Sequence, residues 1–366
     1  MKTYPLQSIS IDEAKEKQFN LVDEICREFS GSEFLTTGDL GIIPGVNKPK
    51  TAKKVEAVLA RYFHAESAVL VTGAGTGALR WGLLSIFQPN QTILIHKAPV
   101  YPTTLTSIKG LNLTVVEADY NDLASLEDVF RNHHIDGALV QFTRQKIDDS
   151  YNAAEVIEVI KKHNDIPVIT DDNYAAMKVH AIGVELGADL SSFSSFKLLG
   201  PEGVGIVLGR KKYTDIIDNM NYSGGSKVQG WQALEVLRGL VYAPVALAIQ
   251  AEENESLVKE LNDGTLPEIK EAFLANAQSK VLLVEFKENI AEQVLIEAEK
   301  LGAAPNPVGA ESKYEIVPMF YRVSGTFLKA DPSLKYRMIR INPMRAGKNT
   351  ILRILKEAIQ GVGSCS

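Results

Sequence analysis

The sequence predicts an α/β protein, with a large domain built on a mostly parallel, doubly wound sheet and a smaller α+β domain at the C-terminus. Between residues 68 and 208, short apolar runs are nearly continuous in Val, Ile and Leu, which is typical of strands covered on both faces. Segments whose apolar residues recur with the period of a helix separate several of these runs, and a repeated strand–helix–strand order favours a parallel sheet. After Tyr213 the pattern changes to a long helix followed by mixed helices and strands.

The individual elements follow from these patterns. The predicted strands of the large domain are 68–71, 92–95, 113–116, 138–142, 167–170, 190–193 and 205–208. The predicted helices between them are 51–63, 77–87, 123–133 and 153–163. Residues 231–250 are predicted to form one long helix, which Pro244 kinks or breaks. Beyond it we expect strands at 281–286 and 338–341 and helices at 291–301 and 350–359.

Length and composition indicate more than one hydrophobic core. The chain has 366 residues, 45% of them hydrophobic, which exceeds the usual size of one compact domain. We expect an N-terminal segment at 1–50, which packs on the small domain or on a partner subunit. A large domain at 51–250 and a small domain at 251–366 follow.

The charge and the cysteines exclude several classes of protein. A net charge of -6, from 39 basic and 45 acidic residues without long runs of one sign, gives no basic surface for nucleic acid or an anionic membrane. Cys26 and Cys365 are isolated, which argues against a disulfide framework or a zinc site. We expect no metal, no spanning segment, since no apolar run approaches about 18 residues, and a cytoplasmic location.

Because open α/β sheets bind ligands beyond the carboxyl ends of their strands, we expect the functional residues at the strand ends. The segment TGAGTGAL at 72–79 follows a strand and opens a helix. Its glycines allow close approach of the backbone, and free N–H groups at a helix start favour phosphate. The spacing also fits a dinucleotide fingerprint, but residues 91–100 contain no acidic residue for the ribose. The alternative is a tight turn that binds no ligand.

A second strand end carries two carboxylates, Asp171 and Asp172, followed by Asn173 and Tyr174. A buried carboxylate at this position requires a cationic partner, because an unpaired buried charge is costly. A helix N-cap or a turn, which Asp and Asn both favour, is the alternative.

Lys197 lies between the strand at 190–193 and a turn rich in Gly and Pro. Desolvation and nearby cations lower the pKa of a lysine, and a neutral amine can form a Schiff base. A lysine that extends to the surface is the alternative. In the small domain, Arg340 lies within a predicted strand, where a guanidinium can bind a carboxylate in bidentate fashion or form a structural ion pair.

In this order and spacing, the motifs resemble those of fold-type-I enzymes that use pyridoxal 5'-phosphate (PLP), the superfamily of aspartate aminotransferase and the cystathionine and methionine lyases. The resemblance covers residues 38–359. The sequence K-x-x-G-P-x-G-x-G that starts at Lys197 is similar to the class-V aminotransferase and selenocysteine-synthase-like branches. The likeness extends to bacterial YhfS-like proteins, which are described as aminotransferase-like.

The resemblance implies a role for each motif. The Gly75 and Thr76 amides and the Thr76 hydroxyl bind the cofactor phosphate together with Ser194. Lys197 forms the Schiff base, and Tyr101 stacks on the cofactor ring.

Asp171 pairs with the pyridine nitrogen, and these three residues, Lys197, Asp171 and Tyr101, are the catalytic candidates. The Tyr174 hydroxyl binds the phenolic oxygen. Asp172 is an alternative ring partner, but only Asp171 has an aromatic residue three positions later. Arg340 binds the substrate carboxylate, and Arg144 is a second anion contact, unless it is only a solvated charge.

Two departures leave the reaction type open. Phe196 stands where class-V enzymes usually carry histidine, and residues 141–145 (QFTRQ) replace the Asn-Pro-rich segment of class-I aminotransferases. We predict an aminotransferase that acts on an amino acid or related amine. The alternatives are a carbon–sulfur lyase that eliminates at the β or γ carbon, and a non-catalytic PLP-binding protein. The resemblance also implies a homodimer with active sites near the subunit interface, to which the segments 38–50 and 222–226 could contribute.

Overall fold

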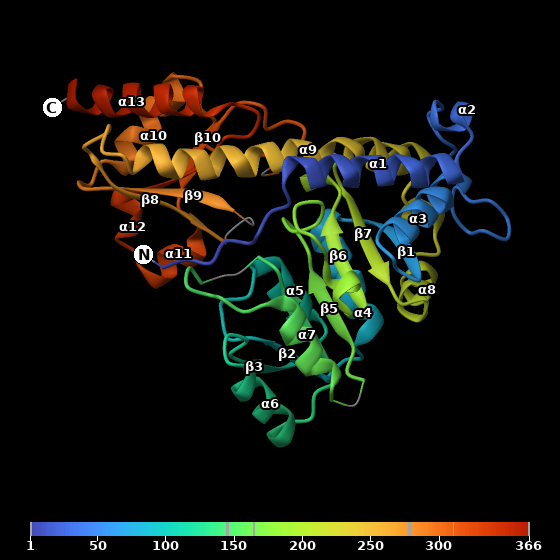
Figure 1. Ribbon diagram of the computed structural model, residues 1–366. Coiled ribbons are helices and arrows are strands. Elements are labelled where there is room, and N and C mark those ends of the chain that lie inside the picture. Colours follow the sequence, from blue (N-terminus) through green and yellow to red (C-terminus); the bar gives the residue numbers. More distant parts are fainter. Residues whose placement is uncertain (1, 144–145, 164, 277–279, 310, 365–366) are drawn as a thin grey trace. The chain divides into compact units, whose positions relative to one another are not determined.

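The computed structural model describes residues 2–143, 146–163, 165–276, 280–309 and 311–364 (Figure 1). The chain divides into two compact units. The larger contains Asp12–Thr143 and Tyr151–Pro244, and the smaller contains Met1–Ile11, Arg144–Ser150 and Val245–Ser366. Residues 12–50, which the sequence set apart as an N-terminal segment, are counted here with the larger unit, and the division after Pro244 falls inside a helix.

A seven-stranded sheet forms the centre of the larger unit, in the order β1-β7-β6-β5-β4-β2-β3. The strands are β1 (Ser67–Thr72), β2 (Thr92–His96), β3 (Thr114–Ala118), β4 (Gly137–Gln141), β5 (Val168–Asp171), β6 (Leu190–Ser194) and β7 (Val204–Gly209). Strands β6, β5, β4, β2 and β3 are parallel to one another, and β7 is antiparallel to both β6 and β1. The predicted mostly parallel sheet is therefore confirmed.

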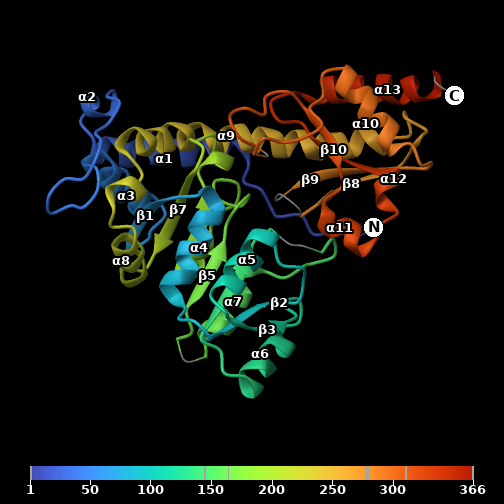
Figure 2. The same cartoon turned by 180° about the vertical axis from the view of Figure 1, so that it is seen from behind.

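Helices cover both faces of this sheet. The larger unit contains α1 (Ile11–Glu28), α2 (Gly31–Phe34), α3 (Lys50–Tyr62), α4 (Ala74–Ile86), α5 (Pro102–Gly110), α6 (Leu123–Asn132), α7 (Ala153–Lys161) and α8 (Lys211–Met220), with short 3-10 helices η1 (Gly183–Leu186), η2 (Phe196–Leu198) and η3 (Gly224–Ser226). Ile169 of β5 and Leu190 of β6 share one core with α4. Phe193 points to the opposite face, where its ring lies 5.7 Å from that of Phe63 at the end of α3. In Figure 2, which shows the molecule from the side opposite to that of Figure 1, α4 lies nearer to the viewer than the strands.

Helix α9 (Gly230–Leu261) is longer than predicted. Pro244 does not end it, and the helix continues to Leu261. A proline inside a helix costs about 3 kcal/mol, but Leu240 and Leu247 on either side of it are both buried, so core packing outweighs that cost. By length and composition the stretch Gly224–Leu261 is also apolar enough to cross a membrane, yet 56% of its apolar window is buried inside the protein, as in the core helix of a globular fold.

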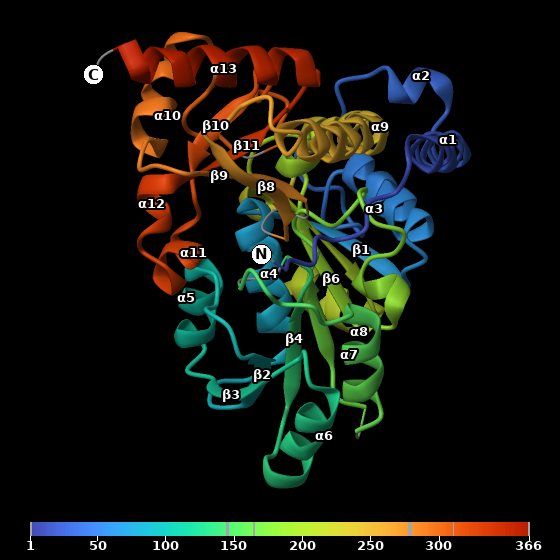
Figure 3. The same cartoon turned by 60° about the vertical axis from the view of Figure 1, so that its left-hand side comes forward.

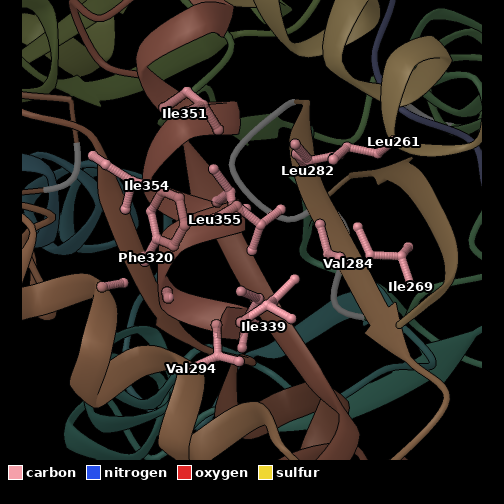
Figure 4. Packing of buried hydrophobic residues seen from close by; sticks show 14 of the residues in the cluster. Leu261, Ile269, Leu282, Val284, Val294, Phe320, Ile339, Ile351, Ile354 and Leu355 are labelled. Carbon is pink, nitrogen blue, oxygen red and sulfur yellow. The ribbon is translucent and has the colours of Figure 1, made fainter. Parts of the chain in front are cut away.

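The smaller unit is built on a four-stranded antiparallel sheet in the order β10-β11-β9-β8. Its elements are β8 (Ile269–Ala275), β9 (Val281–Phe286), β10 (Met319–Arg322), β11 (Met338–Asn342), α10 (Ala291–Lys300), α11 (Gly325–Ala330), α12 (Leu334–Arg337) and α13 (Lys348–Ser364). Figure 3 shows these helices, coloured orange to red, around their strands. Val284, Phe320, Ile339 and Leu355, each at most 1% exposed, belong to one core (Figure 4).

Several elements were missed in the sequence, and their composition explains why. Half of the residues of helix α1 are charged, and the helix buries only Ala14, Leu21 and Ile25, so its apolar stripe is too narrow to recognise from the helical period alone. Strand β8 carries Lys270 and Glu271 near its start. Both elements depend on tertiary packing for their stability rather than on a strong local pattern.

Candidate active site

Four of the predicted site residues gather at one edge of the large sheet. Asp171 ends β5 and Ser194 ends β6, and these strands are parallel neighbours, so their carboxyl ends meet at the same edge. Tyr174 follows β5, and Lys197 lies in η2 directly after β6. The Lys197 Nζ lies 3.9 Å from the centroid of the Tyr174 ring. The structure therefore brings residues from two motifs, more than twenty positions apart, into contact.

Lys197 is held by a tightly constrained turn. It is half-buried, and Leu199 shortly after it has a φ of +62°. Tyr174, which contacts it, has a φ of +65°. Left-handed backbone is unfavourable for bulky residues, and such strain is found preferentially at functional sites. An ammonium group over the face of an aromatic ring is stabilised by the ring's quadrupole, so Tyr174 fixes the position of the Lys197 amine.

The start of α4 presents unused donors. Gly73, with a φ of +100°, precedes the helix, and the N–H groups of Gly73 and Ala74 both donate to the Gly203 carbonyl at 2.8 and 3.1 Å. The N–H groups of Gly75 and Thr76 have no acceptor within the described part of the chain. Together with the positive end of the helix dipole, these two donors can bind an anion.

The two neighbouring aspartates point to opposite faces of the sheet. Asp172 shares the face of Thr170, away from α4, because alternate residues of a strand point to the same side. Its side chain is fully buried and accepts hydrogen bonds from the Thr170 hydroxyl at 2.8 Å and from the Gly183 N–H at 3.3 Å. Asp171 shares the face of Ile169, which is the face that α4 covers.

One oxygen of Asp171 accepts no hydrogen bond from the described residues. Its Oδ1 accepts hydrogen bonds from the Asn173 N–H at 3.1 Å and from the Asn173 amide Nδ2 at 2.7 Å. Among the described residues, Asp171 forms no ion pair with a lysine or arginine, although it is only 7% exposed. A mostly buried carboxylate with an unused oxygen favours a cationic or N–H donor partner, which a ligand can supply.

The environment of Asp172 makes the protein's stability depend on pH. Burial raises the pKa of Asp172 from its ordinary value to about 7, and the neighbouring Asp171 adds to this effect. Because the folded state holds this proton to a higher pH than the unfolded state does, stability falls as the pH rises from about 4 to 7 and is level above 7. A shift of this size corresponds to at most about 4 kcal/mol.

We therefore expect Asp172→Asn to raise the free energy of unfolding relative to the wild type clearly at pH 8 and by much less at pH 5. The asparagine can still accept from the Gly183 N–H, and it can donate to Thr170, whose hydroxyl can then donate to the Leu190 carbonyl at 3.3 Å. Urea unfolding of both proteins at the two pH values measures this difference. A difference between the proteins that is equal at both pH values would contradict the assignment.

The remaining predicted residues differ in what the structure shows of them. Tyr101 precedes α5 and is 53% exposed, and the Thr103 hydroxyl near it lies 3.2 Å from that of Thr76, so α5 begins close to the start of α4. Arg340 belongs to the smaller unit, where its Nε donates to the Arg322 carbonyl at 2.7 Å. Arg144 lies outside the described residues.

One residue of the site was missed in the sequence. Asn173 contacts the Asp171 carboxylate, and its Oδ1 accepts a hydrogen bond from the Ser194 N–H at 3.1 Å. An asparagine after two aspartates is typical of a turn, and nothing in the local pattern distinguishes it from an ordinary turn residue. Only the pairing of β5 with β6 brings it to the centre of the site.

These groups fit pyridoxal 5'-phosphate. The free N–H groups of Gly75 and Thr76 suit its phosphate, and the unused Asp171 oxygen suits its protonated ring nitrogen. The half-buried amine of Lys197 suits its aldehyde. The donor set therefore matches the three polar ends of this cofactor.

Comparisons with known proteins agree with this chemistry. Residues 45–235 match the family model of class-V aminotransferases, and residues 255–355 match the C-terminal domain of YhfS-like proteins. The Escherichia coli protein YhfS is 56% identical over 99% of this chain and its own full length. Its crystal structure, described as that of a PLP-dependent protein, superimposes with a TM-score of 0.97 over 99% of this chain and 100% of its own.

More distant relatives share parts of the chain or only its fold. A cysteine desulfurase of Clostridium botulinum is 26% identical over 57% of this chain and 56% of its own. A cystathionine gamma lyase of Micromonospora echinospora is 15% identical, with a TM-score of 0.71 over 94% of this chain and 98% of its own, which shows a common fold. The chain is therefore a member of the YhfS-like family, PLP-dependent proteins of fold type I with a class-V aminotransferase domain.

Proposed function

We propose that this protein is a PLP-dependent aminotransferase that acts on an amino acid or a related amine, with Lys197 as the covalent anchor of the cofactor. The observation that carries the proposal is the position of Lys197, whose amine lies 3.9 Å from the Tyr174 ring at the sheet edge where Asp171 ends β5. A structural lysine would have no need of a strained turn and a buried carboxylate with an unused oxygen beside it.

The cofactor, when bound, supplies an electron sink for the negative charge that develops on the carbon next to the amine. The protein supplies orientation and electrostatics. The Gly75 and Thr76 N–H groups and Ser194 hold the phosphate, and Asp171 keeps the ring nitrogen protonated. Because Oδ1 of Asp171 already accepts two hydrogen bonds, its other oxygen would be the one that pairs with the ring nitrogen.

Lys197 has a second task as a base. With cofactor and substrate bound, the Lys197 amine would take the proton from the substrate Cα and later return a proton. The face of the Tyr174 ring stabilises the ammonium form that results. We assign the substrate carboxylate to Arg340, whose guanidinium also lies over an aromatic ring, 4.1 Å from the centroid of Tyr321. Tyr101 supplies the ring that stacks on the cofactor.

The class-V aminotransferase match over 45–235 supports transamination. A second candidate is cleavage of a carbon–sulfur bond, which is supported by the partial likeness to enzymes named cysteine desulfurases. Incubation of the holoprotein with single amino acids separates the two. A shift of the absorbance to that of pyridoxamine phosphate, with a keto acid product, is expected. Ammonia together with a thiol product would instead show elimination.

The same experiment tests whether the protein is an enzyme at all. If the holoprotein forms a borohydride-reducible band but no amino compound in a broad screen changes its spectrum or yields a product, the protein binds PLP without catalysis. If no visible band forms with PLP, the assignment of the cofactor site is wrong.

We further propose that two copies of the chain associate through one apolar surface of the larger unit. Leu35, Leu40 and Tyr222 are 85%, 73% and 69% exposed. The segment that carries Leu40 is fixed to the segment before α9, because the Gly41 N–H donates to Gln229 Oε1 at 2.8 Å. Large apolar side chains that are exposed to this degree are typical of a surface that another protein covers.

Leu40→Asp should therefore shift the protein from dimer toward monomer, because it places a charge in the apolar interface. Sedimentation velocity over a range of concentrations measures the effect. Ile296→Asp, at a position of α10 that is 57% exposed, is the matched control and should leave the dimer intact. A wild-type protein that sediments as a monomer at all concentrations would rule out the interface.

A further inference from the structure

We propose that Asn173 is a positioning residue of the site, which holds the Asp171 carboxylate in place and sets its distance from the phosphate-binding start of α4. The inference rests on the proposed cofactor site and goes beyond it, since it assigns a task to a residue that itself need not contact the cofactor.

The first observation is that Asn173 holds the Asp171 carboxylate by two hydrogen bonds. Both the backbone N–H and the side-chain Nδ2 of Asn173 donate to the same oxygen, Oδ1, at 3.1 and 2.7 Å. Two donors on one oxygen fix the rotation of the carboxylate. Asn173 therefore also determines the direction in which the other oxygen, Oδ2, points. Hydrogen bonds to an ionised acceptor are stronger than those between neutral groups, and these two also stabilise the negative charge that the ring nitrogen requires.

The second observation is that every polar group of Asn173 is engaged. Its Oδ1 accepts from the Ser194 N–H at 3.1 Å, and its carbonyl accepts from the Thr143 hydroxyl at 3.2 Å. A flipped amide would set oxygen against the Asp171 carboxylate and NH₂ against the Ser194 N–H, which are both repulsive. The side chain is only 9% exposed. Asn173 therefore has a single orientation, tied to the ends of both β5 and β6.

The third observation concerns Gly75. A Cβ atom at Gly75 would lie 2.5 Å from Oδ1 and 2.8 Å from Nδ2 of Asn173. The φ of Gly75 is not positive, and alanine is the better helix former, so backbone conformation does not require glycine here. The close approach of the Asn173 amide is what requires glycine at position 75.

One amide thus lies between the two ends of the proposed cofactor site. It contacts Gly75, whose N–H serves the phosphate, and it binds Asp171, which serves the ring nitrogen. It also holds the β6 end that leads into Lys197. If Asn173 moves, the spacing between the phosphate donors and the ring partner changes. Binding of the cofactor therefore depends on this side chain.

A double-mutant cycle tests the coupling. Gly75→Ala, Asn173→Ala and the double variant are compared with the wild type in the affinity of the apoprotein for PLP, in the pH titration of the visible band and in thermal stability. Each single variant should weaken PLP binding by roughly tenfold to a hundredfold, the range for lost hydrogen bonds to a charged group. The double variant should bind PLP at least as tightly as the single variant with the lower PLP affinity, because alanine at 173 removes the amide with which the Cβ atom of an alanine at position 75 would collide.

Three further variants sharpen the result. Gly110→Ala, at a glycine with no atom within 4 Å of the added Cβ, is the control and should leave PLP binding unchanged. Asn173→Asp keeps the acceptor for Ser194 but sets a negative charge against Asp171, so it should weaken binding and shift the pH titration of the band. Asn173→Ser, which retains one hydroxyl donor, should restore part of the affinity lost in Asn173→Ala.

Two outcomes would overturn the proposal. The first is strict additivity of Gly75→Ala and Asn173→Ala in PLP affinity. The second is an Asn173→Ala protein with lower thermal stability but unchanged PLP affinity and an unchanged band titration, which is the behaviour of a merely structural residue. Failure of the proposed cofactor site looks different, since the wild type itself would then form no borohydride-reducible band, whereas a protein that binds PLP without catalysis would keep that band and still give the results of the cycle.

Discussion

Lys197→Ala is expected to abolish the borohydride-reducible visible band of the holoprotein and to lower turnover by roughly a hundredfold to ten-thousandfold or more. In the proposed function the residue provides both the covalent anchor and the base, and alanine removes both at once. The surrounding fold should survive, because Lys197 is only half-buried and lies in the short helix η2, not in a strand. Absorbance spectra before and after reduction, together with peptide mass spectrometry of the reduced protein, measure the loss.

A second lysine that lies over the Tyr174 ring provides the control. The Lys178 Nζ lies 5.5 Å from the Tyr174 centroid, and Lys178 is 5% exposed. Lys178→Ala should keep the visible band, with the reduced cofactor still attached to Lys197. Recovery of the adduct on Lys178 in the wild type, or an unchanged band in Lys197→Ala, would show that the anchor has been misassigned.

Asp171→Asn should lower turnover by roughly a hundredfold to several thousandfold, because it removes the negative charge that keeps the ring nitrogen protonated. The loss of one member of a buried ion pair costs about 3–5 kcal/mol. Asparagine has nearly the same shape and can still accept from the Asn173 N–H and Nδ2, so the local hydrogen bonds persist. Kinetics under saturating PLP separate the loss of charge from a loss of cofactor.

Asp172→Asn is the matched control, since it changes the adjacent carboxylate to the same amide. Asp172 points to the face away from α4 and is satisfied by Thr170 and Gly183. We expect its spectrum and turnover to resemble those of the wild type, while its stability at pH 8 rises. If Asp172→Asn were the inactive variant and Asp171→Asn the active one, the assignment of the ring partner would be reversed.

Much of the fold is encoded locally. All seven strands of the large sheet were predicted from apolar runs, because strands covered on both faces require nearly continuous Val, Ile and Leu. The glycines before α4 and the turn after Lys197 are likewise visible, since left-handed backbone and close approach restrict the residue types that fit. Lys197 itself was identified from its place between a strand and that turn.

The elements that were missed or misjudged depend on contacts distant in sequence. Pro244 does not break the long helix, and α9 continues past the predicted end at residue 250 to Leu261, because buried leucines on both sides of the proline outweigh its local cost. The division of the chain into two units falls between Pro244 and Val245, inside that helix. Local propensity carries no information on what packs against a segment.

In the site, too, some features are predictable from the sequence and others depend on the tertiary structure. The sequence by itself determined the residue types and the order of the motifs, from the phosphate loop to Lys197 and Arg340. Only the tertiary structure decided that Asp171 faces α4, that Asp172 is satisfied on the other face, and that Asn173 ties Asp171 to Ser194 and requires glycine at 75. The physical reason is that the face of a side chain and its hydrogen-bond partners are set by strand pairing and helix packing, and both join residues that lie far apart in the chain.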